Sequence, residues 1–345
     1  MDEAENSLTM DVICELSVIA PCFNEEQSLS EFHRRTRFAC ENLGVVNYEI
    51  VLVDDGSRDG TWQIIEDLTS IDCHVVGIKL MRNHGHQLAV TAGLAASRGE
   101  RVLLIDADLQ DPPELLPDMW ELMDRGADVV YGQRKSREGE TLFKRVTASI
   151  FYRFLARATD VQIPLDTGDF RLMSRQIVDM LNVMPERQRF IRGMISWIGG
   201  RQVPLPYDRK PRVAGATKYP LKKMILFAID AFTSFSIMPL RIAFWFGMLF
   251  TIVAFLVLCY ALTQWWLGGT VIGWTSLTAA VALFSGVQLA VLGVIGEYLG
   301  RLVQEAKGRP LYLVENVIGK SVGKRVYRST RPTVHIALGA GRISP

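Results

Sequence analysis

Short apolar runs alternate with amphipathic helical patterns between Leu16 and Tyr131. The apolar runs are short, contain β-branched residues and end at turn residues, which is typical of strands; they are Leu16–Ala20, Tyr48–Val53, Val75–Lys79, Arg101–Ile105 and Asp128–Tyr131. The helical patterns between them cover Ser28–Leu43, Thr61–Ser70, Gln87–Ala96 and Glu114–Arg125. This alternation predicts an α/β fold, Rossmann-like, with a mostly parallel sheet and helices on both faces. Ligands of such sheets bind beyond the carboxyl ends of the strands.

The pattern changes after Tyr131. A mainly helical stretch runs from Leu142 to Trp197 and is broken by the polar segment Leu165–Arg171, and Arg201–Tyr207 predicts a further strand. The apolar stretch Pro220–Met238 follows and has two lysines near its start. This stretch predicts one or two helices that lie at a bilayer surface, with a buried core helix as the alternative.

Two uncharged apolar runs, Ile242–Thr263 and Thr275–Gly296, come next. Each is about as long as the ~20 residues that cross a bilayer, and the connection between them holds no Lys or Arg. Basic residues instead flank the pair, namely Lys222, Lys223, Arg241, Arg301, Lys307 and Arg309. By the positive-inside rule this predicts two membrane spans with both chain termini in the cytoplasm. Two consecutive uncharged runs of this length disfavour the alternative of two buried helices in a soluble protein.

The bulk composition excludes some classes of function. The 345 residues include 38 Lys plus Arg and 37 Asp plus Glu, a net charge of +1, so no general attraction to nucleic acid is expected. The five cysteines are odd in number and lack the spacing of a metal-binding pair, which favours a reduced compartment over a disulfide framework. The acidic N-terminus has no apolar core, so we expect no cleavable signal peptide.

The strongest candidate for chemistry is the acidic cluster that follows the run Arg101–Ile105. Asp106 and Asp108 stand one residue apart there, with Pro112 and Pro113 behind them. Two such carboxylates at a strand end can face a single hard cation, Mg²⁺ or Mn²⁺. The cation would offset the charge that builds on a departing nucleotide diphosphate. A plain turn, in which Asp is common, is the alternative.

Polar segments also follow the first three predicted strands. Pro21–Glu26 and Asp54–Thr61 each carry carboxylates and open a helix. A carboxylate at a strand end can bind a base edge or a ribose hydroxyl, and we interpret Asp54 in this way. Asp59 and Thr61 are interpreted as helix caps. The segment Asn83–His86 predicts a loop that enters a helix near the site, with a metal-binding His pair as the alternative.

Six segments together resemble the family 2 glycosyltransferases with the GT-A fold, and more closely the polyprenyl-phosphate glycosyltransferases. The segments are SVIAPCFNEE, VDDGSRDGT, LMRNHGH, DADLQDPPE, GDFRLMSR and GATKYP. Within that family, Thr167–Arg175 and Ser196–Gly200 are most similar to the bactoprenol (undecaprenyl-phosphate) glucosyltransferases, which are related to dolichyl-phosphate mannose synthases. The resemblance covers roughly residues 16–312. One departure is Cys22-Phe23, where many relatives carry a small residue or Val followed by Tyr; Phe23 keeps an aromatic ring for base stacking.

The resemblance implies roles for individual residues. The nucleotide would be held by Pro21, Phe23, Glu25 and Asp54. The metal and the diphosphate would be placed by Asp106, Asp108 and Gln110. Asp169, which with Asp108 forms the predicted catalytic pair, matches an acidic residue near the reacting carbon that is often proposed as a base. The substrate would further be bound by Arg134, Arg171, Arg192 and Lys218, the last near the membrane entrance.

Elementary chemistry argues against Asp169 as a base. A phosphate monoester has its second pKa near ~6, so the acceptor oxygen is already largely anionic at neutral pH and needs little deprotonation. Two anionic reactants must instead be brought together, which requires a metal and several cationic side chains. We therefore expect Asp169 to position Arg171 or the sugar, or to support the metal's surroundings. A buried ion pair with Arg171 or Arg175 is the alternative.

The predicted protein is thus a membrane-bound hexosyltransferase that uses Mg²⁺ or Mn²⁺. It would transfer a sugar from a nucleotide sugar to polyprenyl phosphate at the cytoplasmic face of the inner membrane. The resemblance implies UDP-glucose as donor, inversion at the anomeric carbon, a homo-oligomer, and a cell-envelope role such as lipopolysaccharide or O-antigen modification. GDP-mannose and a modified UDP-pentose are alternative donors. The predicted domains are a tail (1–15), the GT-A domain (16–219), interfacial helices (220–240), a two-helix anchor (241–300) and a cytoplasmic tail (301–345).

Two rival functions are weighed against this one. A processive polysaccharide synthase of the same fold would carry more spans and a Gln-x-x-Arg-Trp motif, which the sequence lacks. A non-enzymatic lipid-binding or transport subunit would have a degenerate transferase domain, and the intact acidic motifs argue against that.

Overall fold

The computed structural model describes residues 14–134, 167–208, 238–267 and 273–319. The chain divides into two compact units. The first holds the α/β sheet, including residues 310–319, and the second holds two long helices. Lys218, the interfacial stretch up to residue 237, and the helical pattern predicted between residues 142 and 166 lie outside the described residues.

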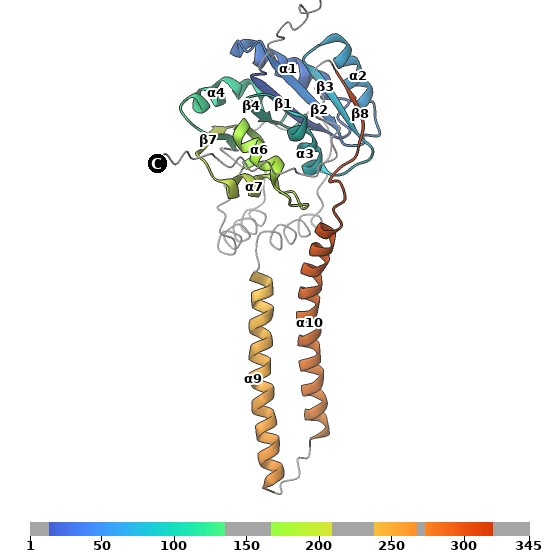
Figure 1. Cartoon of the computed structure of the whole chain (residues 1–345), viewed down its shortest axis with the longest axis vertical. Helices are drawn as coiled ribbons and strands as arrows, with labels where there is room; N and C mark the ends of the chain where they lie inside the picture. Colours follow the sequence, from blue (N-terminus) through green and yellow to red (C-terminus); the bar gives the residue numbers. More distant parts are fainter. Residues whose placement is uncertain (1–13, 135–166, 209–237, 268–272, 320–345) are drawn as a thin grey trace, which may run out of the picture. The chain divides into compact units, whose positions relative to one another are not determined.

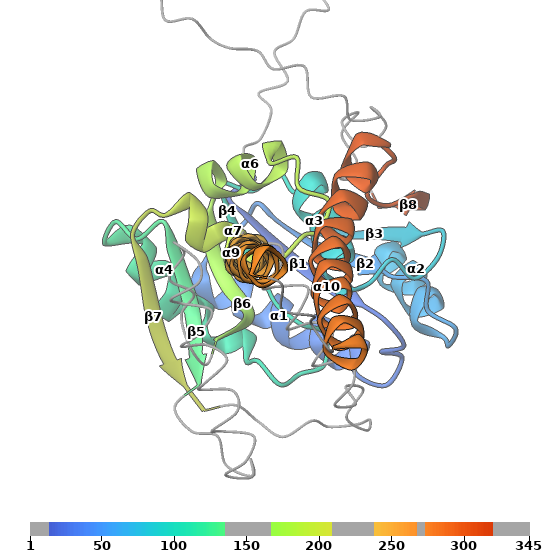
Figure 2. The same cartoon turned by 90° about the horizontal axis from the view of Figure 1, so that it is seen from below.

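One eight-stranded sheet forms the first unit, in the order β7-β5-β6-β4-β1-β2-β3-β8. Its strands are β1 Leu16–Cys22, β2 Tyr48–Asp54, β3 Val75–Leu80, β4 Arg101–Leu104, β5 Val129–Arg134, β6 Thr167–Ser174, β7 Gln202–Tyr207 and β8 Val314–Ile318. The strands β4, β1, β2 and β3 run parallel, as the sequence predicts. Figure 2 shows β7 and β8 at opposite edges of the sheet.

Helices cover both faces of this sheet, which confirms the predicted α/β layering (Figure 1). On one face lie α1 Leu29–Leu43, α2 Thr61–Ile71 and α4 Leu116–Asp124, the last preceded by a short 3₁₀ turn, Pro113–Leu115. On the other face lie α3 His86–Ala96, α6 Arg175–Val183 and α7 Ile191–Ile198. Residues on both faces of the central strands are fully buried, so the strands read as continuous apolar runs.

The helix α3 approaches the sheet closely because Gly93 has no side chain. A Cβ atom at Gly93 would lie 2.3 Å from Cγ2 of Ile19 on β1. Ile19 and the α3 residues Ala89 and Val90 are fully buried. This packing fixes the direction of α3, and therefore the position of its first residues at the carboxyl end of the sheet.

The strand β6 differs from the prediction of a polar break at Leu165–Arg171. It lies between β4 and β5 and runs antiparallel to both. Phe170 and Leu172 enter the apolar core, while Asp169 and Arg171 are buried with 4% exposure each. The segment therefore looks polar in sequence because its charged side chains have partners inside the protein, rather than because it is a loop.

The sequence predicts a cytoplasmic tail over residues 301–345, a range that contains the strand β8. In the structure it pairs antiparallel with β3, and Ile318 packs against the backbone of β3: a Cβ at Gly77 would lie 2.8 Å from Cγ1 of Ile318. Just before β8, the Leu313 carbonyl accepts a hydrogen bond from the amide of Met81 at 2.9 Å. The chain that follows the last long helix thus completes one edge of the eight-stranded sheet.

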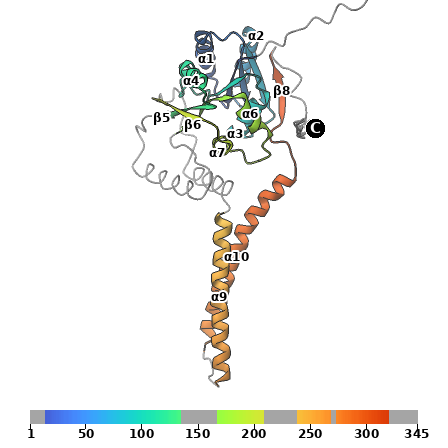
Figure 3. The same ribbon diagram turned by 60° about the vertical axis from the view of Figure 1, so that its left-hand side comes forward.

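The second unit contains α9 Met238–Trp266 and α10 Trp274–Ala306. They lie side by side (Figures 1 and 3), and Phe250 meets Phe284 edge to face with ring centroids 5.8 Å apart. The predicted spans fall within these helices, and α10 continues beyond the predicted end at Gly296. Among the described residues, one stretch is long and apolar enough to cross a membrane: Leu283–Gly300, with a mean hydropathy of 1.5 and none of it buried.

A truncation tests whether β8 belongs to the catalytic fold. A chain that ends after Gly308 loses the β8 pairing and the burial of Ile318, so its free energy of unfolding should fall by at least ~2 kcal/mol. A chain that ends after Lys320 keeps β8 and serves as the matched control, with unchanged stability. Thermal unfolding of both purified proteins provides the measurement, and equal melting temperatures would contradict a structural role for β8.

Candidate functional site

A cluster of carboxylates lies where β4 ends. Asp106 follows this strand, and Asp108 and Asp111 are buried just beyond it. The turn is tight: Leu109 adopts a left-handed φ of 62°, and the amide of Gln110 donates to Oδ1 of Asp108 at 3.1 Å. The acidic motif predicted from sequence is therefore a compact turn at the carboxyl end of the sheet.

The register of β6 brings Asp169 to the same end of the sheet. Leu104 of β4 pairs with Arg171 of β6, and because the strands are antiparallel, Asp169 lies beyond the end of β4 beside Asp106. Nε2 of His86, the first residue of α3, lies 2.9 Å from Oδ2 of Asp169 and 3.7 Å from Oδ1 of Asp106. The imidazole therefore joins the two carboxylates.

Three side chains from two helices hold the carboxylate of Asp169. Nε of Arg192, on α7, donates to Oδ1 at 2.6 Å. His86 and Nε2 of Gln87, both on α3, reach Oδ2 at 2.9 and 3.3 Å. Oε1 of Gln87 also accepts a hydrogen bond from the amide of Ile191 at 2.9 Å. The carboxylate thus ties β6, α3 and the start of α7 together.

The charge state of Asp169 follows from these partners. Burial alone would raise the pKa of its carboxyl, but Arg192 and His86 outweigh that effect and hold the pKa well below its usual range. A carboxylate that is ionised and fully engaged at neutral pH is a poor proton acceptor. The geometry therefore favours a positioning role for Asp169 over a general base.

The expected partner of Asp169 is corrected by the structure. Arg171 donates instead to the backbone carbonyls of Gly168 and Asp169, at 2.9 and 3.3 Å, and Arg175 donates to the carbonyl of Gly99 and the hydroxyl of Ser97. Burial lowers the pKa of Arg171 to about 10. This buried guanidinium supports the start of β6 through its hydrogen bonds to the carbonyls of Gly168 and Asp169, and its predicted role in substrate binding stays a prediction.

Electrostatics at the end of β4 fits a divalent cation. Burial raises the pKa of Asp106 to about 6, and repulsion from Asp169, Asp111 and Asp108 adds to this rise while His86 opposes it. Burial would lower the pKa of His86, but Asp169 and Asp106 raise it to about 9, so the imidazole is protonated at neutral pH. Carboxylate oxygens in mutual repulsion are the ligand set that Mg²⁺ and Mn²⁺ take.

Asp54, at the end of β2, uses only one of its two carboxylate oxygens in hydrogen bonds among the described residues. The side chain is fully buried, and Oδ1 accepts a hydrogen bond from the amide of Ser57 at 3.1 Å. Oδ2 has no hydrogen-bond partner among the described residues, and burial raises the pKa of the group. A buried oxygen of this kind favours an incoming N–H or O–H donor.

The two loops beside Asp54 are fastened to each other. The amide of Asn24 donates to Ser57 Oγ at 3.0 Å, and Asn24 Oδ1 accepts from the amide of Arg58 at 2.9 Å. The amide of Glu25 donates to Thr61 Oγ1 at 2.8 Å. The predicted nucleotide residues at the ends of β1 and β2 are thereby held in one rigid pair of loops.

Individual predictions at these loops have different outcomes. Asp59 Oδ1 accepts hydrogen bonds from the amide and hydroxyl of Thr61 at 3.1 and 2.6 Å, but the N-cap position of α2 belongs to Gly60 rather than to the predicted caps Asp59 and Thr61. Pro21 is buried inside β1 opposite Val53, so only its backbone can border a ligand. Proline is tolerated here because the pairing of β1 with β4 has already ended at Ile19. Phe23 and Glu25 are half-buried.

Arg134 reaches the same end of the sheet from β5. Gln133 pairs with Thr167, and a Cβ at Gly168 would lie 3.1 Å from Nη2 of Arg134 and 3.8 Å from Oδ2 of Asp111. The hydroxyl of Tyr207 donates to Asp111. Gly168 therefore leaves room for Arg134 beside the acidic turn.

Asp55 is a positioning residue that the sequence interpretation missed. Its two oxygens accept hydrogen bonds from the amides of His84 and Gly85 at 2.7 and 2.9 Å, and Gly85 has a φ of 96°, which favours glycine. The amide of Leu313 reaches Nε2 of His84 at 3.4 Å. The loop is thus held immediately before His86 and Gln87. A glycine directly before a helix start was the available signal.

Comparisons with known proteins match both units of the chain. The protein-family model described as "Glycosyl transferase family 2" matches residues 17–181. A second family model, described as "GtrB C-terminal hairpin", matches residues 238–302. An "Uncharacterized glycosyltransferase YkcC" of Bacillus subtilis is 44% identical over 90% of this chain and 96% of its own length. The chain belongs to the family 2 glycosyltransferases. It is accordingly a transferase enzyme with a GT-A-like fold.

Other relatives of this glycosyltransferase carry more specific names. The "Prophage bactoprenol glucosyl transferase homolog" of Escherichia coli is 38% identical over 88% of this chain and 99% of its own length. The "Bactoprenol glucosyl transferase" of Shigella phage SfV is 38% identical over 87% and 98%. A solved glucosyl-3-phosphoglycerate synthase of Mycobacterium tuberculosis overlays with a TM-score of 0.44 at 20% identity, over 62% of this chain and 75% of that one. That overlay is too loose to place a ligand here.

Replacement of Asp169 by Asn tests its role in the glycosyltransferase. The amide cannot neutralise Arg192 and His86, so we expect a loss of sugar transfer of about 100-fold or more that is not recovered as the pH rises from 7 to 9. Asp179→Asn is the matched control, because Asp179 forms an exposed pair with Arg175 at 3.4 Å and should leave the rate unchanged. A transfer rate of Asp169→Asn that climbs back towards wild type as the pH rises would instead support the base role.

Proposed function

We propose that this glycosyltransferase moves glucose from UDP-glucose onto a polyprenyl phosphate, undecaprenyl phosphate in particular. The observation that carries the proposal is the set of relatives named bactoprenol glucosyl transferase, which are 38% identical over almost their whole length. This chain also matches the family models of both the transferase domain and the hairpin. GDP-mannose and a modified UDP-pentose remain the alternative donors within the same chemistry.

The nucleotide would bind at the paired loops after β1 and β2. Phe23 would stack on the base, and Asp54 would accept a hydrogen bond from a base N–H or a ribose hydroxyl through Oδ2, which lacks a partner among the described residues. Glu25 would complete this end of the site, with Oε2 oriented by the hydroxyl of Ser28 at 2.8 Å. Pro21 would contribute backbone and shape.

The diphosphate would bind at the acidic turn after β4. Asp106, Asp108 and Gln110 would hold Mg²⁺ or Mn²⁺, since the carboxylates supply hard oxygen ligands in mutual repulsion. When bound, the cation supplies positive charge against the leaving nucleotide diphosphate. The tight turn at Leu109 keeps these residues in one place before the ligand arrives.

The acceptor phosphate would be bound by Arg134 and Arg192, and Lys218, which lies outside the described residues, stays a predicted phosphate ligand. Its anionic oxygen attacks the anomeric carbon while the bond from that carbon to the nucleotide diphosphate breaks, with inversion. No proton has to be removed in this step, because the attacking oxygen is already ionised. Asp169 would hold Arg192 and His86 in place, as a positioning residue, while Asp108 would act at the metal.

The membrane part would bring a long prenyl chain to a water-soluble donor. At ~1.5 Å per residue, both α9 and α10 exceed the ~30 Å of a bilayer's apolar core. We therefore propose that α9 and α10 form a two-span anchor in the inner membrane with both termini in the cytoplasm. Interfacial helices at 220–240 and a homo-oligomeric assembly are further parts of the proposal. The predicted domain boundaries stay part of the proposal, except that α9 begins at Met238, α10 extends to Ala306 and β8 is included in the sheet.

The enzymatic proposal is tested by identifying a lipid product. The purified full-length chain in detergent should convert undecaprenyl phosphate and UDP-glucose, with Mn²⁺ or Mg²⁺, into a lipid whose mass has increased by one hexose. Parallel reactions with GDP-mannose and a UDP-pentose identify the donor by mass spectrometry. Hydrolysis of every donor without a glycosylated lipid would contradict the proposed acceptor.

The two-span topology is tested separately with reporter fusions. A reporter that works only outside the cytoplasm should be active when it is inserted after Leu267, between α9 and α10. A reporter that works only inside the cytoplasm should be active when it is fused to the C-terminus. A fusion at the N-terminus serves as the control and should match the C-terminal one. The same side for all three positions would contradict two spans.

A further inference from the structure

A second cluster of possible metal ligands lies in the turn between α2 and β3. Asp72 follows the last residue of α2, Cys73 and His74 come next, and β3 begins at Val75. The cluster is therefore at the amino end of β3, whereas the acidic turn and Asp169 lie at the carboxyl ends of the parallel strands. It belongs to none of the groups that the proposed transfer reaction uses.

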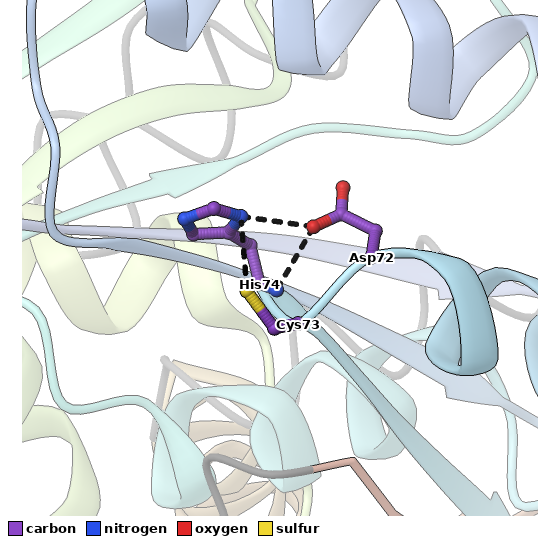
Figure 4. A group of neighbouring side chains, drawn as sticks. All are labelled: Asp72, Cys73 and His74. Atoms are coloured by element: carbon purple, nitrogen blue, oxygen red, sulfur yellow. Dashed lines mark hydrogen bonds and ion pairs between the residues drawn. The ribbon is translucent and has the colours of Figure 1, made fainter.

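Three different donor atoms converge in this turn. Figure 4 shows the imidazole of His74 next to both the carboxylate of Asp72 and the thiol of Cys73, and the same carboxylate accepts a hydrogen bond from the amide of His74 at 2.9 Å. Nδ1 of His74 lies 2.8 Å from Oδ1 of Asp72 and 3.9 Å from Sγ of Cys73, and all three donor atoms lie within 4.8 Å of one another. Distances of this size between donor atoms suit a cation that lies ~2.0–2.3 Å from each donor atom.

Surrounding residues hold two of these donors in place. Asp72 is 4% exposed, and its other oxygen, Oδ2, pairs with Nε2 of the buried His33 on α1 at 2.8 Å. The ring of His74 stacks on Tyr48, with centroids 4.1 Å apart and an interplanar angle of 4°. His33 thus orients the carboxylate of Asp72, as residues behind a metal ligand commonly do in metal sites.

Access is left open on the side of the thiol. Cys73 is exposed, and the side chain of His74 is 33% exposed. An ion can therefore enter from solvent and keep a water molecule as its fourth ligand.

We propose that Asp72, Cys73 and His74 form a surface site for a borderline or soft divalent cation, Zn²⁺ by preference, with His33 as its outer partner. The thiolate and imidazole donors select Zn²⁺ or Co²⁺ over Mg²⁺, whereas the all-oxygen cluster at Asp106 has the opposite preference. Binding replaces the contact between His74 and Asp72 by bonds to the ion and releases the thiol proton of Cys73 to solvent. The two sites are thus separated both in position and in metal preference.

Co²⁺ provides a direct probe, because a thiolate ligand gives a sulfur-to-cobalt absorption band in the near ultraviolet. The full-length protein, reduced and in detergent, is titrated with Co²⁺, and Zn²⁺ is then added to displace it. We expect a saturable band with one Co²⁺ per chain that Zn²⁺ abolishes. Cys73→Ser should remove the band, and His74→Ala should weaken Co²⁺ binding at least tenfold, which corresponds to about 1.4 kcal/mol.

Two controls keep the test decisive. Cys259→Ser removes another exposed cysteine, on α9, and should leave the band unchanged. Cys73→Ser should retain the wild-type melting temperature and glycosyl transfer rate, because Cys73 is exposed and lies away from the candidate active site. The absence of a saturable band in the wild type, or a band of equal intensity in Cys73→Ser, would overturn the proposal.

Discussion

Concentrated negative charge at one end of the sheet is the constraint on which the rest of this structure depends. Asp106, Asp108, Asp111 and Asp169 meet where β4 ends and β6 begins, and the reactants of the proposed transfer are anions as well. Such a site is stable and useful only if positive charge is supplied to it. Arg192 and His86 neutralise Asp169, and we propose that a divalent cation offsets the charge of the acidic turn.

The fold supplies these charges from separate parts of the chain. The parallel strands deliver Asp54 and the acidic turn to one end of the sheet, and the antiparallel β6 returns Asp169 to that end. α3 and α7 then place His86 and Arg192 on opposite oxygens of Asp169. Asp55 and the segment before β8 hold the loop from which α3 starts. Asp55 and the segment before β8 therefore help to set the geometry of the residues that we propose to bind substrates.

Much of this arrangement could be predicted from the sequence because local signals carry it. The strands from Leu16 to Tyr131 are apolar and bounded by turns, and the acidic motif directly follows one of them. The start of α2 at Thr61 was likewise predictable, although Gly60 and not Asp59 takes the N-cap position.

The remainder depends on contacts between distant residues. β6 contains Asp169 and Arg171, and only their buried partners explain charged residues inside a central strand. Arg192 was a candidate phosphate ligand, yet its pairing with Asp169 spans 23 residues. β8 lies far from β3 in sequence and is too short to be recognised without it. Lys218 lies outside the described residues, so its predicted role is unchanged.

The central claim is that a cation at the acidic turn makes the transfer between two anions possible. Its most direct test measures Mn²⁺ binding by electron paramagnetic resonance in the presence of UDP. The wild type is compared with the double variant Asp106→Asn, Asp108→Asn. The account predicts that the double variant keeps its fold but loses both Mn²⁺ affinity and formation of the glycosylated lipid, each by about 100-fold or more. A double variant that transfers sugar at the wild-type rate would contradict it.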